Sequence, residues 1–483
     1  MSNTKTVAII GGGVSGLSAG GLLSRQGFKV KLFEANNKTG GCCSSTVING
    51  YLFNDGALYL AFPGILEHVF NILGLNRSKL LPMRKITKNL TSTLPDGTVV
   101  LIGDGIDLRI ENSPVNIDMG RVQKELDIFM KKWEPVLRLF ADDILIHPFS
   151  LLRVLAKGWR HLRKFKGTVA SEMDSMFSDR AVRSALSGVL LYAGVPPQKA
   201  PVSLMLGLVA MMSEGFHLPE GGMGRIPEVL SQAFTANGGE IFLNSPVKKI
   251  VIKNGKVCGM DVEGHGFVEA DAVISTVSGM HTYGSLIDRE FVPAELKKKV
   301  ETAPLSHKSL SLQIGLSKNI NARSHSNKII PMLEEQYKAL VLEEKEMKCL
   351  IYSVSTVTMP ELAPEGKTII EMFPAINQDL PFEQWESEKE KVADLAISAL
   401  RRLYDAEVVA KRVRSPKDFS DQMHLYKGAI YGLSPAADPK AQFPHNPPIS
   451  GLFHCGQSTY PGFGAGISAM SGIFAADALM KSK

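Results

Sequence analysis

Three glycines near the start of the chain have the spacing of a phosphate-binding turn. The apolar run from Val7 to Ile10 predicts a strand, and the turn that follows reads Gly11-x-Gly13-x-x-Gly16 before a helix. Gly11 permits the tight turn, Gly13 lets the backbone approach a pyrophosphate, and Gly16 lets the helix pack closely on the strand. The helix N-terminus offers unpaired N–H groups and a positive dipole end to the phosphates. The pattern predicts a dinucleotide site.

An acidic residue follows where a ribose contact is expected. The segment Lys29–Glu34 predicts a second strand, which Glu34 ends about twenty residues beyond the glycines. A carboxylate at this place accepts hydrogen bonds from a ribose diol. Because a strand, a glycine turn, a helix and an acid occur in this order, the segment is far more specific than the glycines alone.

Later glycine-rich segments favour FAD over NAD as the dinucleotide. After the second strand, Gly40-Gly41-Cys42-Cys43 adds backbone N–H groups near the phosphates, which a long dinucleotide needs. The segment Gly456–Gly466 joins the last strand to the last helix, whose N-terminus can face the pyrimidine edge of a flavin. The segment Leu218–Gly224 forms a further tight loop before a helix. Each loop alone also fits an ordinary turn or helix cap, but their order together predicts FAD.

The composition is that of an ordinary globular protein. The chain has 483 residues, 44% of them hydrophobic, and a net charge of +6, so two or three domains are expected. The five cysteines are few, and their spacing shows no paired ligands, which predicts a reducing, cytoplasmic location and no metal site.

The nucleotide-binding strand begins almost at residue 5, which leaves no room for a signal peptide. No apolar run is long enough to cross a bilayer. No basic and aromatic array suggests nucleic acid.

The elements that must position these loops alternate between strands and helices. Residues 86–110 predict a hairpin with its turn at Asp96-Gly97, and residues 117–212 are helical in pattern. Further strands are predicted at Glu240–Leu243, Val247–Lys253, Val257–Val262, Asp271–Thr276 and Leu452–Gly456, with a last helix at Ile467–Met480. Residues 300–415 alternate strands and helices.

The opening strand and the closing helix cannot fold alone, so the nucleotide-binding unit is expected to be assembled from separate segments. We expect an α/β fold with three parts. A Rossmann-like FAD-binding domain comprises residues 1–84, 213–282 and 426–483, and a mixed-sheet substrate domain comprises residues 85–116 and 283–425. A helical, membrane-facing subdomain comprises residues 117–212.

Residues 151–166 predict a basic amphipathic helix. At 100° per residue, Leu151, Leu152, Leu155, Trp159, Leu162 and Phe165 share one face, and Arg153, Lys157, Arg160, Arg163 and Lys164 share the other. The segment contains no acid, so it is suited to lie on a membrane surface with its cations toward anionic head groups. The alternative is a helix that packs its apolar face into the core. Gly158 weakens the helix in either case.

The chain resembles the phytoene desaturase family of FAD-dependent oxidoreductases, which includes carotenoid desaturases, carotenoid cis–trans isomerases and retinol saturases. The resemblance rests on the opening motif, Gly40-Gly41-Cys42-Cys43, Phe53-Asn54-Asp55-Gly56, Leu218–Leu230, Gly238–Val262 and Gly451–Ala478. It implies that Glu34 binds the adenosine ribose, that Val247 contacts the adenine end, and that Gly456, Gln457, Gly466 and Ile467 line the flavin. Relatives carry Arg where this chain has Cys42, so one charged phosphate contact is missing. The full set of expected cofactor contacts is Gly11, Gly13, Val14, Ser15, Gly16, Glu34, Ala35, Gly41, Cys42, Val247, Gly456, Gln457, Gly464, Gly466, Ile467 and Ser468.

The catalytic residues are less well marked than the cofactor site. A reaction at a C–C bond moves a hydride and a proton, and the candidate acids and bases are Asp55, Glu214, Glu220, His217, His281 and His307. The sequence does not choose among them, although Asp55 also suits an ordered loop. Met205, Met211, Met212 and Phe216 fit either an apolar tunnel or an ordinary core.

We therefore expect an FAD-dependent oxidoreductase that desaturates, saturates or isomerises a carotenoid or retinoid at a membrane surface. One alternative is a flavin amine oxidase or a protoporphyrinogen oxidase-like enzyme, and another is a non-enzymatic flavin- or lipid-binding protein. No second Gly-x-Gly-x-x-Gly opens another βαβ unit, so electrons are expected to pass to or from a quinone, oxygen or a transient reductant. The sequence leaves the oligomeric state open.

Overall fold

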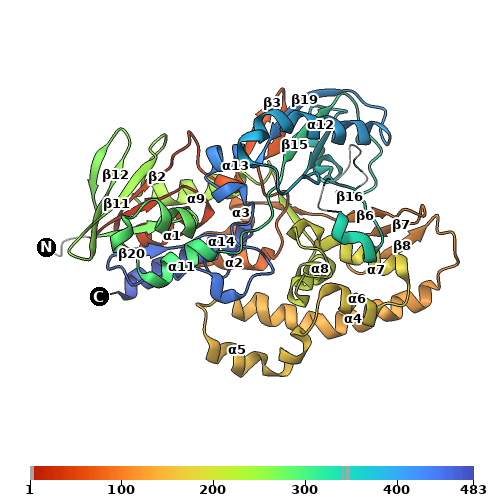
Figure 1. Ribbon diagram of the computed structural model, residues 1–483, viewed down its shortest axis with the longest axis horizontal. Helices are drawn as coiled ribbons and strands as arrows, with labels where there is room; N and C mark the ends of the chain where they lie inside the picture. Colours follow the sequence, from red (N-terminus) through yellow and green to blue (C-terminus); the bar gives the residue numbers. More distant parts are fainter. Residues whose placement is uncertain (1–4, 340–341, 343–346, 348, 483) are drawn as a thin grey trace.

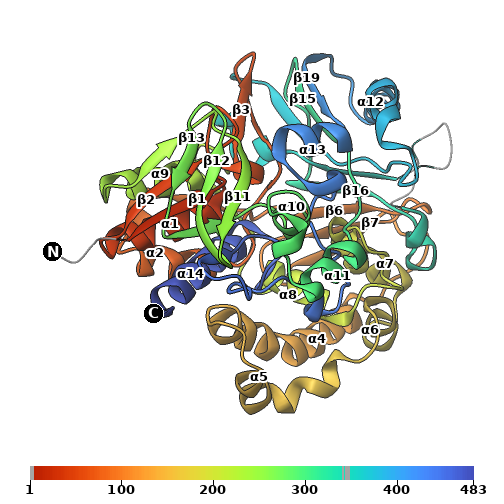
Figure 2. The ribbon, with the colours of Figure 1, turned by 60° about the vertical axis from the view of Figure 1, so that its left-hand side comes forward.

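The computed structural model describes residues 5–339, 342, 347 and 349–482. Figure 1 shows three regions: a parallel sheet with its helices beside both chain ends, a mixed sheet under α12 (Trp385–Arg401), and a layer of helices below it. Figure 2 shows the same three regions after rotation, with α5 (Leu151–Gly158) at the lower edge in both views.

The first region is a five-stranded parallel sheet in the order β10-β2-β1-β14-β20. Its strands are β1 (Thr6–Ile10), β2 (Lys29–Phe33), β10 (Glu240–Phe242), β14 (Ala272–Ser275) and β20 (Leu452–His454). Val7, Ala8 and Ile9 are fully buried, as the apolar run requires, because helices cover both faces of a parallel sheet. The expected Rossmann-like sheet, assembled from distant segments, is therefore confirmed.

Three helices pack around this sheet and carry the glycine turns. They are α1 (Val14–Arg25), α9 (Arg225–Ala236) and α14 (Ala465–Lys481). A side-chain Cβ at Gly472 of α14 would lie 2.0 Å from the Ser15 carbonyl oxygen of α1, so the two helices cross at the closest distance that backbones allow. This crossing sets the first turn of α1 against the middle of α14.

A small antiparallel sheet covers the same region. It consists of β11 (Val247–Lys253), β12 (Lys256–Val262) and β13 (Gly266–Glu269). Asn254 and Gly255 have φ angles of 51° and 74°, which are the positive values that a two-residue type I′ turn needs. The predicted turn is confirmed.

The mixed sheet has eight strands in the order β19-β15-β18-β17-β16-β6-β7-β8. Only the pair β16–β6 is parallel among the described strands of this sheet. The strands are β6 (Leu90–Thr93), β7 (Val99–Ile102), β8 (Leu108–Glu111), β15 (Ser311–Leu316), β16 (Ser326–Ile329), β17 (Leu350–Ser353), β18 (Thr368–Met372) and β19 (Val408–Arg414). The expected mixed sheet is confirmed, and Asp96-Gly97 forms the turn between β6 and β7.

The helical layer follows the pattern of residues 117–212. Its helices are α4 (Met119–Leu139), α5, α6 (Val169–Met176), α7 (Arg180–Gly188) and α8 (Met205–Ser213). Met205, Met211 and Met212 are buried in the core that these helices share, so their main use is packing.

Residues 151–166 are not one continuous helix. The α-helix α5 ends at Gly158, and a 3₁₀ helix, η3 (Trp159–Phe165), continues the chain. Glycine weakens a helix at this point, as expected. Phe165 also leaves the exposed face, because its ring packs on Trp133 and Phe140 with centroids 6.1 and 5.7 Å apart.

The expected boundary at residue 282 divides one packed cluster. Tyr283, Ile287 and Leu296 are buried together with Ala8 and Ile250 of the nucleotide-binding region. Helix α11 (Ala294–Thr302) and the loop before it therefore pack with that region rather than with the mixed sheet.

Shorter elements connect these regions. They are β3 (Ser45–Ile48), β4 (Tyr51–Asn54), α2 (Pro63–Ile72), α3 (Arg77–Leu80), β5 (Met83–Lys85), β9 (His217–Pro219), α10 (Gly279–Gly284) and α13 (Pro416–Met423). Within the described residues, no helix is long and apolar enough to cross a membrane.

Candidate active site

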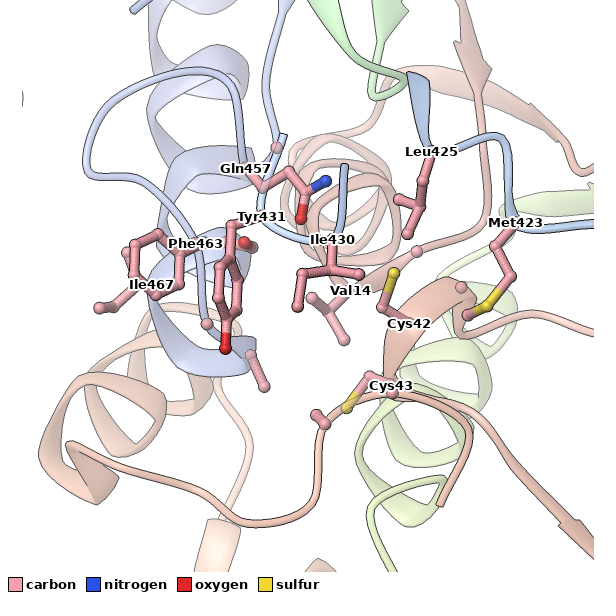
Figure 3. A pocket seen from close by; sticks show the side chains of 18 of the residues that line it. Val14, Cys42, Cys43, Met423, Leu425, Ile430, Tyr431, Gln457, Phe463 and Ile467 are labelled. Atoms are coloured by element: carbon pink, nitrogen blue, oxygen red, sulfur yellow. The ribbon is translucent and has the colours of Figure 1, made fainter. Parts of the chain in front are cut away.

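One cavity of about 750 Å³ joins the glycine turns at the two ends of the chain. It is lined from the first turn by Ile10, Gly11, Gly13, Val14 and Ser15, and residues between 456 and 468 contribute from the second. Figure 3 shows Val14 of α1, Gln457 and Ile467 of the second turn, and Cys42 around the same space. The fold therefore brings the two glycine turns, which lie far apart in the sequence, to one cavity.

The first turn holds Glu34 in a fixed position. Glu34 is 6% exposed, and its Oε2 accepts a hydrogen bond from the Gly12 N–H at 2.7 Å. Its Oε1 accepts bonds from the backbone and side-chain amides of Asn36 at 2.9 and 3.0 Å. The carboxylate lines the cavity just past the end of β2, where acceptor lone pairs can meet a diol.

The second turn presents a helix N-terminus to the cavity. Gly464 precedes α14 with a φ of 107°, a conformation that favours glycine, and the following residues line the space. The first N–H groups of a helix have no partner inside it, and the helix dipole is positive there. Both α1 and α14 therefore point a positive end at the cavity.

The expected cofactor contacts converge on this cavity. All of them line it except Gly16, which lies beneath the turn. A Cβ at Gly16 would lie 2.2 Å from the Gly11 carbonyl oxygen, so its role is the close packing of helix on strand that the motif predicts. Contact of the other residues with a cofactor stays a prediction.

Cys42 and Cys43 bring no charge to the cavity wall. Burial raises the pKa of Cys42 to about 11 and that of Cys43 to about 12, so both thiols are neutral near pH 7. Nearby positive charge comes instead from Arg412 and Arg414 of β19, which both contact Asp55. No sequence motif indicates that this distant strand packs beside the Cys42 loop.

Asp55 is the centre of a buried network. Burial by itself raises its pKa, but Arg414, Ser44 and Lys38 together hold the pKa below its ordinary value. The carboxylate accepts bonds from Lys38 at 2.9 Å, Ser44 at 2.7 Å and Arg412 at 2.7 Å. Asp55 therefore stays ionised and orders the loop that carries the two cysteines.

Three further candidate acids and bases also lie outside the cavity. Glu214 forms an ion pair with Arg138 at 3.5 Å, and Glu220 forms one with Arg84 at 3.4 Å. His217 lies in strand β9 and does not line the cavity. Together with Asp55, these residues have structural surroundings rather than access to a ligand.

His281 and His307 do line the cavity. The Nδ1 of His281 lies 3.1 Å from the Ser278 hydroxyl, and its ring meets Tyr426 edge-on at 5.3 Å. The Nδ1 of His307 is buried and has no hydrogen-bond partner among the described residues, and burial lowers the pKa of this imidazole to about 4. Its ring faces Tyr431 at 5.9 Å.

The remainder of the cavity is apolar and aromatic. Tyr59 stacks on Phe216 with ring centroids 4.4 Å apart and meets Tyr192 edge-on at 6.2 Å. Figure 3 shows Tyr431 and Phe463 facing each other across from Cys42 and Met423. No sequence motif marks the segment 419–431 that supplies several of these side chains.

Few charged groups face this space. Glu34 is the only carboxylate among the described residues that line the cavity, and Lys308 is the only lysine or arginine. Burial lowers the pKa of Lys308, and Asp379 opposes that effect. Sequence reasoning missed Lys308, which precedes β15 without any motif.

A family model places the chain among known proteins. The model of the flavin-containing amine oxidoreductases matches residues 14–480. A 4,4'-diapophytoene desaturase (4,4'-diapolycopene-forming) of Methylomonas sp. is 25% identical and covers 96% of this chain and 93% of its own. A zeta-carotene-forming phytoene desaturase of Myxococcus xanthus is 24% identical over 99% of this chain and 94% of its own. A 4,4'-diaponeurosporene oxygenase of Staphylococcus aureus is 25% identical over 98% of both chains.

Solved structures show the same fold at lower identity. An oxidoreductase from Methanosarcina mazei aligns with a TM-score of 0.65 and 18% identity, covering 98% of this chain and 100% of its own. Putrescine oxidase bound to putrescine aligns with a TM-score of 0.63 and 16% identity, covering 99% of both chains.

Proposed function

The chain belongs to the flavin-containing amine oxidoreductase family, and we propose that it binds FAD and acts on C=C or C–C bonds of a lipophilic isoprenoid at a membrane surface. It is a flavin-dependent oxidoreductase distantly related to carotenoid desaturases and oxygenases. The observation that carries the proposal is the single cavity that runs from Glu34 past both helix N-termini into an apolar, aromatic end.

The chemistry of the cavity wall fits FAD. Glu34 supplies acceptors for the adenosine ribose, and the N-terminus of α1 suits the pyrophosphate. The N-terminus of α14, with Gly466 and Ile467, suits the flavin ring, and Val247 suits the adenine end. A bound flavin supplies the hydride donor or acceptor, which no side chain can replace.

The apolar end of the cavity fits an isoprenoid better than an amine. An ammonium substrate needs an anionic or polar pocket, yet Glu34 is the only described carboxylate that lines the cavity, and its contacts hold it at the other end. Aromatic rings at Tyr59, Phe216 and Tyr431 offer flat surfaces for a polyene. The likeness to putrescine oxidase extends to the fold alone.

His307 is the residue that we propose to handle the proton. Its imidazole is neutral near pH 7 because burial lowers the pKa to about 4, so it can accept a proton that an isoprenoid carbon releases. His307 lines the cavity, and its Nδ1 is buried against Gly194, so Nε2 is the nitrogen that would accept the proton.

The segment around α5 is the proposed membrane contact. Its apolar side chains do not pack in the core: Leu152 is 80% exposed and Trp159 is 61% exposed. Arg153 and Lys157 turn inward to Asp143, whereas Arg160, Arg163 and Lys166 form no ion pair with any described residue. An exposed apolar patch beside free cations suits an anionic lipid surface. Phe140, which packs on Phe165, also lines the cavity and links the two sites.

The test is product formation by the FAD-loaded protein in liposomes. We expect phytoene or a cis-lycopene to be desaturated or isomerised, with retinol as the probe for saturation by the reduced protein. A His307→Asn variant should retain bound FAD and lose product by at least about a hundredfold, since a positioned base contributes roughly that factor. Turnover of putrescine with no change in any polyene would contradict the proposal, and bound flavin with neither reaction would favour a carrier.

A further inference from the structure

A second, small pocket adjoins the aromatic end of the main cavity. Its volume is about 20 Å³, which is room for a single water-sized group. Tyr59, Tyr192 and Phe216 line both spaces, so the pocket and the cavity adjoin at these rings. Its other lining residues are the apolar Ile86, Leu90, Val189 and Met211 and the polar Asn89, His325, Ser326 and Lys328. Such a group of polar residues is unexpected at the end of an apolar tunnel.

Lys328 is the least expected of these residues. It is 2% exposed, and its ammonium donates to the Gly188 carbonyl oxygen at 2.5 Å and lies 4.4 Å from the centre of the Tyr192 ring. No carboxylate among the described residues forms an ion pair with it. Burial lowers the pKa of Lys328 to about 7, which reports how poorly the charge is compensated. An ammonium has three N–H donors, so this one has capacity for another acceptor.

Two neighbouring atoms also lack partners. His325 and Asn89 are only 1% and 3% exposed. The Nε2 of His325 and the Oδ1 of Asn89 have no hydrogen bond to any described residue. The other nitrogen of His325 lies 3.1 Å from the Thr358 hydroxyl, and the Asn89 amide donates to the Gly103 carbonyl at 2.6 Å. Both side chains are thus held in place with one polar atom unused. Leaving such atoms unsatisfied costs free energy.

We propose that this pocket binds a terminal oxygen of the isoprenoid, and that the natural substrate ends in a carbonyl or carboxylate group. Lys328 donates to that oxygen, while Tyr59, Tyr192 and Phe216 stack on the adjoining double bonds. The proposal rests on the function proposed above and narrows its substrate class. A plain hydrocarbon would leave the spare N–H groups of Lys328 and the Nε2 of His325 without an acceptor, so it would bind less well.

The experiment is a competition among three isoprenoids of one carbon skeleton. FAD-loaded protein is equilibrated with equal amounts of geranylgeranoic acid, geranylgeranial and the corresponding hydrocarbon in mixed micelles. The protein is then separated, and the bound lipids are quantified by mass spectrometry. We expect the acid to exceed the hydrocarbon by about tenfold or more, which is the effect of one charge-assisted hydrogen bond. The aldehyde should fall between them.

A Lys328→Met variant removes the ammonium and keeps much of the side-chain volume. The ratio of acid to hydrocarbon should fall to about one, with the amount of bound hydrocarbon unchanged. The control is Lys318→Met, which removes an exposed lysine paired with Asp405 and should leave the ratio as it is. The wild-type competition needs no substitution, so it decides the matter even if Lys328→Met does not fold.

The outcomes separate the two proposals. Equal binding of acid and hydrocarbon by the wild type would overturn the terminal-oxygen site and leave the isoprenoid function standing. Failure to bind any of the three lipids would overturn both. A wild-type preference that survives in Lys328→Met would overturn the role of the ammonium.

Discussion

At the scale of single residues, the site is built by groups whose hydrogen bonds fix their charge. Glu34 and Asp55 are both buried carboxylates, but they do different things. Asp55 is surrounded by cations and hydroxyl donors, so it anchors a loop. Glu34 is held by amide donors alone and faces the cavity, so its remaining lone pairs are free for a ligand.

The first prediction concerns Glu34. Glu34→Gln loses the charge on its acceptor oxygens, and the dissociation constant for FAD should rise roughly ten- to a hundredfold, as the loss of charge-assisted hydrogen bonds implies. Titration of the apoprotein with FAD, followed by flavin fluorescence, measures this change. Glu240→Gln is the control, because Glu240 is an exposed acid on the neighbouring strand β10. An unchanged affinity in Glu34→Gln would refute the ribose assignment.

Buried histidines predict how stability depends on pH. Burial lowers the pKa of His454 from 6.5 to about 4, and its Nε2 lies 2.9 Å from the Val277 carbonyl oxygen. Between these two pKa values the unfolded chain binds a proton that the folded chain does not. The free energy of unfolding should therefore fall as the pH drops from about 6.5 to 4, by on the order of 3 kcal/mol for one such group.

Urea unfolding at several pH values measures this dependence, and His454→Gln should flatten it. Gln can still donate to the Val277 carbonyl oxygen but does not titrate. His307 and His325, whose pKa values are also about 4, should retain their share of the slope in this variant. A slope identical to that of the wild type would show that His454 is not the source.

At the scale of elements, the crossing of α1 and α14 makes the site. A Gly472→Val substitution places carbon atoms where the Ser15 carbonyl oxygen lies, so the two helices must move apart. We expect a loss of about 1–3 kcal/mol in stability. Binding of FAD should weaken as well, because the first turn of α1 moves relative to α14, the helix that follows the second glycine turn. Thermal unfolding with and without FAD measures the two effects.

Gly64→Ala is the matched control for the crossing. Gly64 lies in α2, and a Cβ there meets nothing within 4 Å. This variant should be as stable as the wild type or slightly more so, since Ala favours a helix over Gly. If Gly472→Val were equally harmless, the close crossing would not be what positions the turns.

The exposed face of α5 and η3 carries the membrane prediction. Trp159→Asp should weaken sedimentation with anionic liposomes by roughly tenfold or more, because burial of an aromatic side chain in lipid is lost. Val47→Asp is the control, because Val47 is an exposed apolar residue on a different element, β3. This variant should bind to liposomes as the wild type does. Equal binding by Trp159→Asp and the wild type would contradict the membrane role of this segment.

At the scale of the whole molecule, local motifs predicted the sheets better than the site. The glycine turns, the strands beside them and the Asn254-Gly255 turn follow from backbone conformation, which depends on nearby residues. Long-range packing brings Lys308, Arg414 and Lys328 to the site or its surroundings. No local sequence pattern predicts such packing. The helix predicted over residues 151–166 is too long, because α5 ends at Gly158. Its basic face also differs from the prediction, because Arg153 and Lys157 form ion pairs with Asp143.

The central claim is that distant segments enclose one FAD whose flavin ring borders an apolar cavity. A crystal structure of the protein purified with its cofactor tests this most directly. The account predicts a single FAD, with its adenosine ribose at Glu34 and its flavin ring beside Gly466 and Ile467, facing Tyr431. A flavin ring that points away from Tyr431 into solvent, or a cavity that holds no dinucleotide in the FAD-supplemented protein, would contradict it.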